Sequence, residues 1–172
     1  MTELIDWTPN AHALIVHLPI GLLVAAFAAE LVALLRRRPE TVATVSTALY
    51  AAGWLTLAAA YLTGRAAAPE VYTPGLAVPV VDRHWTWALW CLLYFGALTA
   101  GRLWVLGVPG RRPRAGGTGE ASAQAGATRR RAAHLAFGAA GLAGLLLLAA
   151  TAELGGRLVY QYGVGVAAPL VE

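Results

Sequence analysis

The stretch AAHLAFGAAGLAGLLLLAATAEL, residues 132–154, decides the class of fold. His134 and Glu153 are its only ionisable side chains, and the rest is almost entirely apolar. A membrane-crossing helix needs about 20 mainly apolar residues. Three further stretches meet the same requirement, at 11–35, 41–63 and 84–106. The sequence therefore predicts an all-α, integral membrane protein with four spans.

The composition of the whole chain agrees with that reading. Of its 172 residues, 58% are hydrophobic and only 13% are charged, and the mean hydropathy is +0.60. Soluble domains carry about 25% charged residues, so a soluble enzyme, a disordered tail and a secreted disulfide scaffold are excluded. The single cysteine, Cys91, lies in an apolar run and can form neither an intramolecular disulfide nor a thiolate metal site alone.

The positions of the basic residues predict the orientation. All 13 are arginines, and ten of them lie at 36–38, in 107–131 or at Arg102, whereas only Arg65, Arg83 and Arg157 belong to the other side. Positive residues stay on the cytoplasmic side of a bilayer. We therefore expect both termini on the periplasmic or outer side of a bacterial inner membrane. The same clustering explains the net charge of +4 without nucleic-acid binding.

The connectors predict how the spans are arranged. Residues 107–131, rich in Gly, Pro, Ala and Arg, are typical of a flexible cytoplasmic linker. Residues 64–83 contain three prolines and are expected to form an irregular outer loop. With connectors this short, consecutive helices are antiparallel neighbours, so residues 1–172 should form a single four-helix bundle.

Glycines predict two details of the fourth helix. Gly138, Gly141 and Gly144 give it a small-residue face for close packing. Gly155 and Gly156 can adopt positive φ and are expected to end it. The following Gly163 and Gly165 would then let the tail fold back over the outer mouth of the bundle.

Two ionisable residues near the cytoplasmic ends of the spans are expected to pair. Glu30 and Arg102 each lie about one helical turn inside the boundary, on the first and third spans. An unpaired charge at that depth costs several kcal/mol, which favours a structural ion pair between them. His134 follows three arginines and is expected to be a solvated boundary residue.

Three histidines on the outer side raise the question of a cofactor. His12 and His17 belong to the first span and His84 to the third. Two imidazoles at matched depth on different helices can ligate a haem iron axially. His12 and His17 lie about 140° apart around a helix, so they cannot line one face, and either can be the inward one. Alternatively, His17 hydrogen-bonds a carbonyl that Pro19 leaves free.

Two motifs resemble a known family. They are HALIVHLPIGL, from His12, and ELGGRLVYQYGVGV, from Glu153. Together with His84 they are similar to the bacterial membrane family "domain of unknown function 2231", whose pattern opens H-P-x-x-V-H-F-P-I-A-L and closes G-G-x-L-V-Y-x-x-G-V-G-V. The resemblance covers essentially the whole chain. Ala13, Leu18 and Gly21 depart mildly from the pattern.

The resemblance implies a four-helix membrane protein. Some members are joined to or lie beside Rieske or c-type cytochrome modules, so the family looks related to b-type cytochromes. By that likeness His17 and His84 would be the haem ligands. His12 would be a competing ligand or an outer-rim residue. From their depth along the fourth span, Glu153 and Tyr160 are also expected on the outer rim. The chain has no second histidine pair near the cytoplasmic side, so at most one haem b is implied.

These features lead to one functional expectation and two alternatives. We expect an electron carrier in the membrane with a redox partner in the membrane or periplasm. The sequence is compatible with a monomer or with a homo-oligomer. The first alternative is a cofactor-free accessory or scaffold subunit, and the second is a small-solute or metal transporter. No Ser or Thr is accompanied by a His–Asp pair, and no phosphate loop or dinucleotide fingerprint occurs, so a stand-alone catalyst is not expected.

Overall fold

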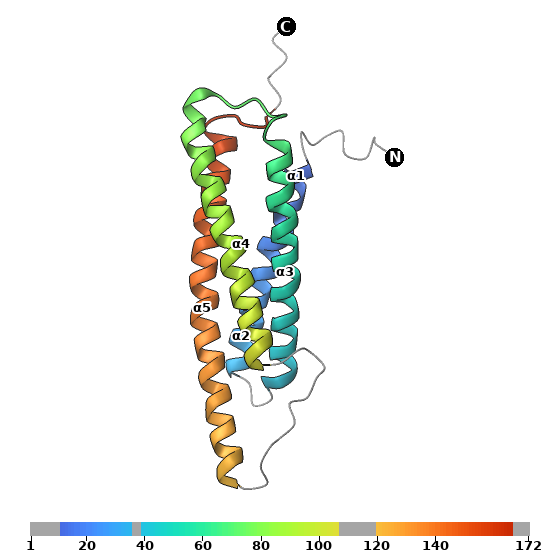
Figure 1. Ribbon diagram of the computed structural model, residues 1–172, viewed down its shortest axis with the longest axis vertical. Coiled ribbons are helices and arrows are strands. Elements are labelled where there is room, and N and C mark those ends of the chain that lie inside the picture. Colours follow the sequence, from blue (N-terminus) through green and yellow to red (C-terminus); the bar gives the residue numbers. More distant parts are fainter. Residues whose placement is uncertain (1–10, 36–38, 107–119, 167–172) are drawn as a thin grey trace, which may run out of the picture.

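The computed structural model describes residues 11–35, 39–106 and 120–166, and this part of the chain is almost entirely helical (Figure 1). Four helices, or helix pairs in line, are long and apolar enough to cross a membrane. The all-α, four-span prediction is therefore confirmed. In chain order the elements are α1 (Ala11–Ile15), α2 (His17–Leu35), α3 (Pro39–Ala67), the short 3₁₀ turn η1 (Gly75–Ala77), α4 (Val78–Leu106) and α5 (Glu120–Tyr160).

The helices form an elongated bundle of two hairpins. The most extensive packing is between α2 and α3 and between α4 and α5, and the hairpins meet through α3 with α4 and α2 with α5. Figure 1 shows the long helices running side by side, with α1 and the end of α5 at the same end of the bundle. This is the antiparallel four-helix arrangement that the short connectors predict.

The first span is interrupted at Val16, which lies in a turn between α1 and α2. The amide of Val16 still donates to the carbonyl of His12, at 3.1 Å. Pro19 has no N–H to donate to the carbonyl one turn earlier, that of Ile15, and its ring crowds that position. A proline in this place therefore accounts for the break, and its fully buried ring faces the bundle interior.

The connectors are more helical than predicted. The expected linker at 107–131 is wrong for its second part, because α5 already begins at Glu120; residues 107–119 lie outside the described residues. Residues 120–131 are rich in alanine, the best helix former. The expected outer loop at 64–83 shrinks to 68–77, since α3 continues to Ala67 and α4 begins at Val78.

The fourth helix also ends later than predicted. Gly155 and Gly156 lie inside α5, which continues to Tyr160. Among the described residues, those with positive φ are Gly163 and Gly165, at 66° and 75°. The amide of Gly163 donates to Val159 O, at 3.1 Å, and so satisfies a terminal carbonyl of the helix. From this point the chain turns across the end of the bundle (Figure 1).

The small-residue face of α5 packs against side chains of the facing helices, not against their backbones. Gly138, Gly141 and Gly144 are all buried. A Cβ at Gly144 would lie 2.8 Å from the ring of Phe95, and one at Gly141 would meet the hydroxyl of Tyr50. These glycines therefore make room for side chains, chiefly aromatic, from the facing helices.

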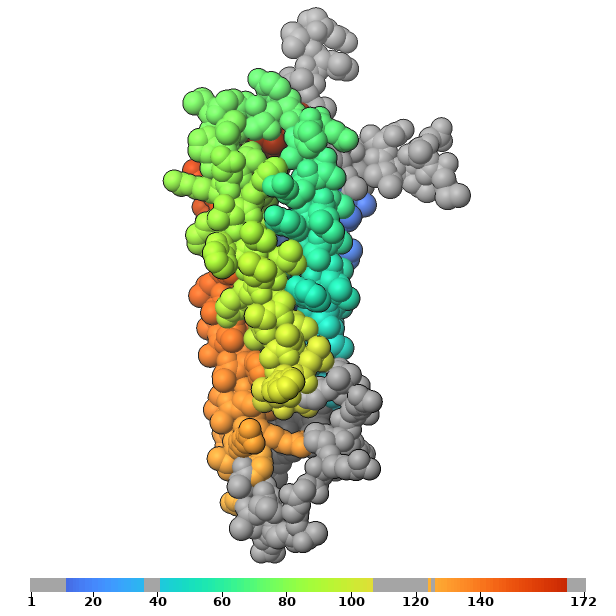
Figure 2. All heavy atoms as spheres, viewed as in Figure 1, coloured from blue at the N-terminus to red at the C-terminus, as the bar shows by residue number. Residues whose placement is uncertain are grey.

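The surface of the bundle suits a lipid environment. At most a third of the residues in each span's most apolar window are buried inside the protein. Large apolar side chains face outward along every span, and Figure 2 shows the narrow, elongated body that they cover. The protein is therefore a multi-pass membrane protein whose outward faces contact the lipid bilayer.

Candidate functional site

Polar side chains inside the bundle gather at two levels. The outer histidine site, so named after the predicted orientation, consists of His12 and His84 near the ends of α1 and α5. The inner cluster, near the other end, consists of Glu30, Arg102, His134, Ser46 and Thr47. The core between these levels contains Leu23, Leu57, Phe95 and Leu148 among other apolar residues.

Each histidine of the outer site is anchored to the backbone of a neighbouring helix. Nδ1 of His12 lies 2.9 Å from the carbonyl oxygen of Ala60 in α3. Nδ1 of His84 lies 3.1 Å from the carbonyl oxygen of Thr151 in α5. Because a carbonyl oxygen only accepts, Nδ1 carries the proton in both rings, and the free lone pair lies on Nε2.

A glycine lies against each of these imidazole rings. A Cβ at Gly64 would come within 2.9 Å of the His12 ring, and a Cβ at Gly155 within 3.2 Å of the His84 ring. A larger side chain at either position would displace the imidazole. The two rings belong to opposite hairpins, His12 to α1 and His84 to α4.

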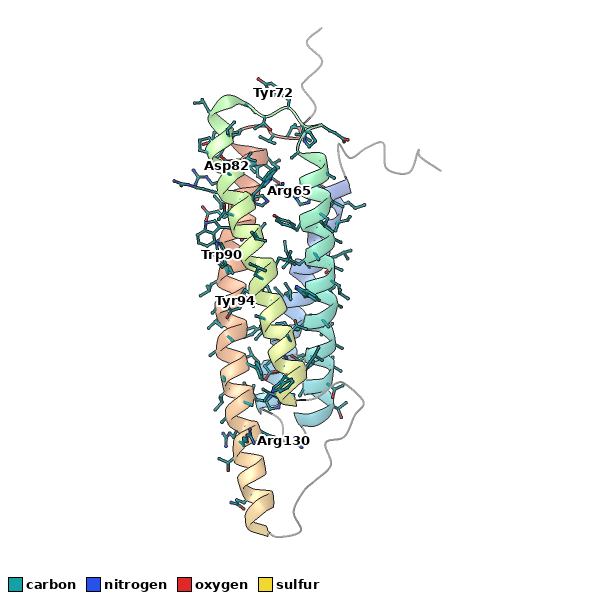
Figure 3. The ribbon with its side chains drawn as sticks, viewed as in Figure 1. Arg65, Tyr72, Asp82, Trp90, Tyr94 and Arg130 are labelled. Carbon is teal, nitrogen blue, oxygen red and sulfur yellow. The ribbon has the colours of Figure 1, made fainter. Side chains whose placement is uncertain are left out.

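An arginine and a tryptophan lie directly beside the histidines. Arg65 follows Gly64 and Trp85 follows His84, and the Arg65 guanidinium lies 4.2 Å from the centre of the Trp85 ring. This distance is typical of a cation–π contact. Figure 3 shows Arg65 between the upper parts of α3 and α4. The contact ties the two hairpins together at this end of the bundle.

The histidine pair of the outer site is not the one expected from the family resemblance. His17 is exposed at the start of α2, whereas His12 is half-buried and hydrogen-bonded. The break at Val16 separates these two residues into different helices. Glu153 and Tyr160 are both exposed on α5. Within the described part of the chain, no three His, Cys, Asp or Glu side chains come together as a metal site.

The inner cluster is built around Glu30, which is fully buried. Its Oε2 accepts a hydrogen bond from Nη2 of Arg102, at 2.6 Å, and a second from the hydroxyl of Ser46, at 3.2 Å. Its Oε1 accepts from Nδ1 of His134, at 2.8 Å. The structure thus brings Glu30 and Arg102 together, and it joins all four long helices at one carboxylate.

Arg102 is also fully buried and has partners from two further directions. Its Nη2 lies 3.1 Å from the hydroxyl of Ser46 and 3.3 Å from that of Thr47. The rings of Tyr50 and Phe137 lie 4.9 and 5.2 Å from its central carbon. Sequence inspection considered serines and threonines only as nucleophiles, so it missed the role of Ser46 and Thr47 as partners of this arginine.

The expectation that His134 is a solvated boundary residue is wrong. Only 9% of the residue is exposed, because its imidazole turns inward to Glu30. A signal for this was present in the sequence. His134, Gly138 and Gly141 are spaced by four and then three residues, which places them on one face of a helix. The two glycines mark that face as the interior.

Comparison with known proteins identifies the family. A family model described as "Predicted membrane protein (DUF2231)" matches residues 8–168, so the chain belongs to this family. No curated protein and no solved structure matches the chain.

Proposed function

We propose that this member of the DUF2231 family binds one haem b at the outer histidine site and carries electrons in the membrane. The observation that supports the proposal is the matched pair of Nδ1–H···O=C hydrogen bonds made by His12 and His84. Histidines that ligate metals use the same arrangement, in which one ring nitrogen donates to a carbonyl and the other holds the metal. A haem held by two histidines supplies a one-electron redox centre.

The two residues fit such a group in their donor chemistry. Both rings present a lone pair at Nε2, and His12 and His84 would hold the group from the two hairpins. Gly64 and Gly155 hold the rings without crowding them. His17 fits less well, because it is exposed and no hydrogen bond fixes its ring among the described residues.

The proposed orientation places the outer histidine site on the periplasmic side. Arg129, Arg130 and Arg131 are exposed at the opposite end of the bundle, where Arg130 is labelled in Figure 3. Cationic residues at that end favour the cytoplasm. An electron carried at the outer site would then be passed to a periplasmic or membrane redox partner.

The test is haem content and spectrum. The chain is produced in a haem-replete host, purified in detergent, and its haem is quantified as the pyridine haemochrome before and after dithionite. We expect about one haem per chain and an α-band in the reduced spectrum. The band should be lost in His12→Ala and in His84→Ala, and it should be kept in the matched control His17→Ala. In His84→Gly the band should return when imidazole is added to the buffer. If His84 had only a structural role, added imidazole would not restore a haem spectrum.

Either of two results would overturn the proposal. A folded, haem-free wild-type protein would favour the cofactor-free scaffold, in which the two histidines only fasten α1 to α3 and α4 to α5. An unchanged spectrum in His12→Ala would reject His12 as a ligand. In the scaffold case the histidine variants would lower thermal stability without any spectroscopic change.

A further inference from the structure

Arg102 carries more N–H groups than the described residues accept. Only its Nη2 has acceptors, in Glu30, Ser46 and Thr47. Its Nε and Nη1 are buried without a hydrogen-bond partner in the described part of the chain, and the same holds for the hydroxyls of Tyr50 and Thr99. Thr99 lies three residues before Arg102 on α4, so the two side chains share one face of the helix.

The four buried polar atoms that have no hydrogen-bond partner among the described residues need a polar ligand. A buried donor without an acceptor loses the hydrogen bonds that it makes to water in the unfolded chain. The rings of Tyr50 and Phe137 stabilise the guanidinium charge, but they offer no acceptor in the plane of its N–H groups. Each of the four atoms belongs to a residue with at most 4% of its surface exposed, so the ligand must lie inside the bundle.

Neutral water satisfies these groups better than an anion does. Glu30 and Arg102 already form a neutral pair, and an added anion would leave a net negative charge in a low-dielectric interior. Water can accept from the guanidinium and also donate to or accept from the hydroxyls of Thr99 and Tyr50. Internal waters commonly serve buried polar groups that protein atoms leave unpaired.

His134 is the member of the inner cluster that is least enclosed by the protein. Its side chain is 11% exposed, whereas those of Glu30 and Arg102 are fully buried. Residues 126–132, the two turns of α5 that precede it, are exposed on every side. His134 is therefore the least buried member of the inner cluster, and it follows an exposed stretch of its own helix.

We propose that the inner cluster is an internal water site, which water enters past His134 from the arginine-rich end of the bundle. Nδ1–H of His134 donates to Glu30, so Nε2 is the nitrogen left to bind water. The charged group that contacts this imidazole is Glu30 from α2, whose other carboxylate oxygen binds Arg102 from α4 and the hydroxyl of Ser46 from α3. Arg130 and Arg131 lie within one turn on its own helix.

The test measures contact with water directly. The full-length protein, labelled with ¹⁵N in arginine, histidine and tryptophan, is placed in lipid bilayers. Transfer of magnetisation from water to each side-chain nitrogen is then measured by solid-state NMR. The internal control is Trp54, whose indole N–H donates to the carbonyl of Leu92 at 3.1 Å and needs no water. We expect transfer to Arg102 Nε to be about tenfold faster than to Trp54 Nε1 and transfer to His134 Nε2 to be at least as fast.

A second variant separates a hydrated cluster from a dry one. Thr99→Val removes a hydroxyl without changing the shape of the side chain. If water binds there, the variant should slow the transfer to Arg102 Nε several-fold and lower the thermal stability. The proposal is wrong if Arg102 Nε receives no more transfer than Trp54 Nε1, if Thr99→Val raises the thermal stability, or if the Arg102 signal depends on chloride. None of these measurements requires haem.

Discussion

Replacing Glu30 with glutamine should strongly destabilise the bundle. The carboxylate is fully buried and accepts hydrogen bonds from side chains on α3, α4 and α5. Gln keeps the shape but removes the charge, so Arg102 would remain buried without its counter-charge. Breaking a buried ion pair by removing one partner costs about 3–5 kcal/mol. We expect a loss near the lower limit, because the amide oxygen of Gln still accepts one hydrogen bond.

The assay is reversible unfolding in bicelles by titration with sodium dodecyl sulfate, followed by tryptophan fluorescence. The matched control is Glu153→Gln, the same substitution at an exposed position of α5, which should leave the free energy of unfolding almost unchanged. The double variant Glu30→Gln with Arg102→Met removes both charges. It should cost at least about 1 kcal/mol less than the sum of the two single variants, because contacting residues couple.

Two results would refute this reasoning. One is a loss below about 1 kcal/mol in Glu30→Gln, the size of an ordinary hydrogen bond. The other is strict additivity in the double variant, which would mean that the two side chains are not energetically linked. Haem binding should survive the substitution if the outer histidine site is the haem site, because the two sites lie at opposite ends of the bundle.

Three further predictions concern packing, backbone and topology. Gly144→Ala should lower the free energy of unfolding by about 1–3 kcal/mol in the same assay, because its Cβ would lie 2.8 Å from Phe95. The control Gly156→Ala, whose Cβ would meet nothing within 4 Å, should be neutral or stabilising. Equal effects of the two variants would contradict the packing around Gly144. Gly163→Ala should cost about 1–2 kcal/mol because of its φ of 66°, and thermal melts that match wild type would reject that strain. In intact cells an impermeant maleimide should label Leu76→Cys, because Leu76 is 84% exposed in the connector before α4, and it should not label Thr128→Cys. The native Cys91 is fully buried and adds no background labelling. Labelling of Thr128→Cys alone would mean that the topology is the reverse of the predicted one.

The sequence allowed the fold to be predicted because hydrocarbon imposes one simple requirement. Backbone groups in a bilayer must be satisfied within each segment, so every long apolar run has to be a helix. Length and hydropathy therefore located four spans, and short connectors made them antiparallel. The ion pair of Glu30 with Arg102 could also be anticipated, since depth along a helix is readable from residue number alone.

The errors concerned places where local composition is a weak guide. Gly and Arg in 107–131 suggested a flexible linker, but the alanines around them support the first turns of α5. Gly155 was expected to end a helix, yet the structure uses it as the surface against which the His84 ring lies. In both cases a residue type that permits a loop was mistaken for one that requires it.

The sequence by itself thus determined that this protein is a four-helix membrane bundle, and at which depth each polar side chain lies. Only the tertiary structure decided which of these side chains meet. It turned His12 rather than His17 toward Ala60, and it brought His134 inward to Glu30. Depth follows from the fixed rise of a helix. Rotation about the helix axis depends instead on how the side chains of four helices fill the space between them, which no single segment specifies.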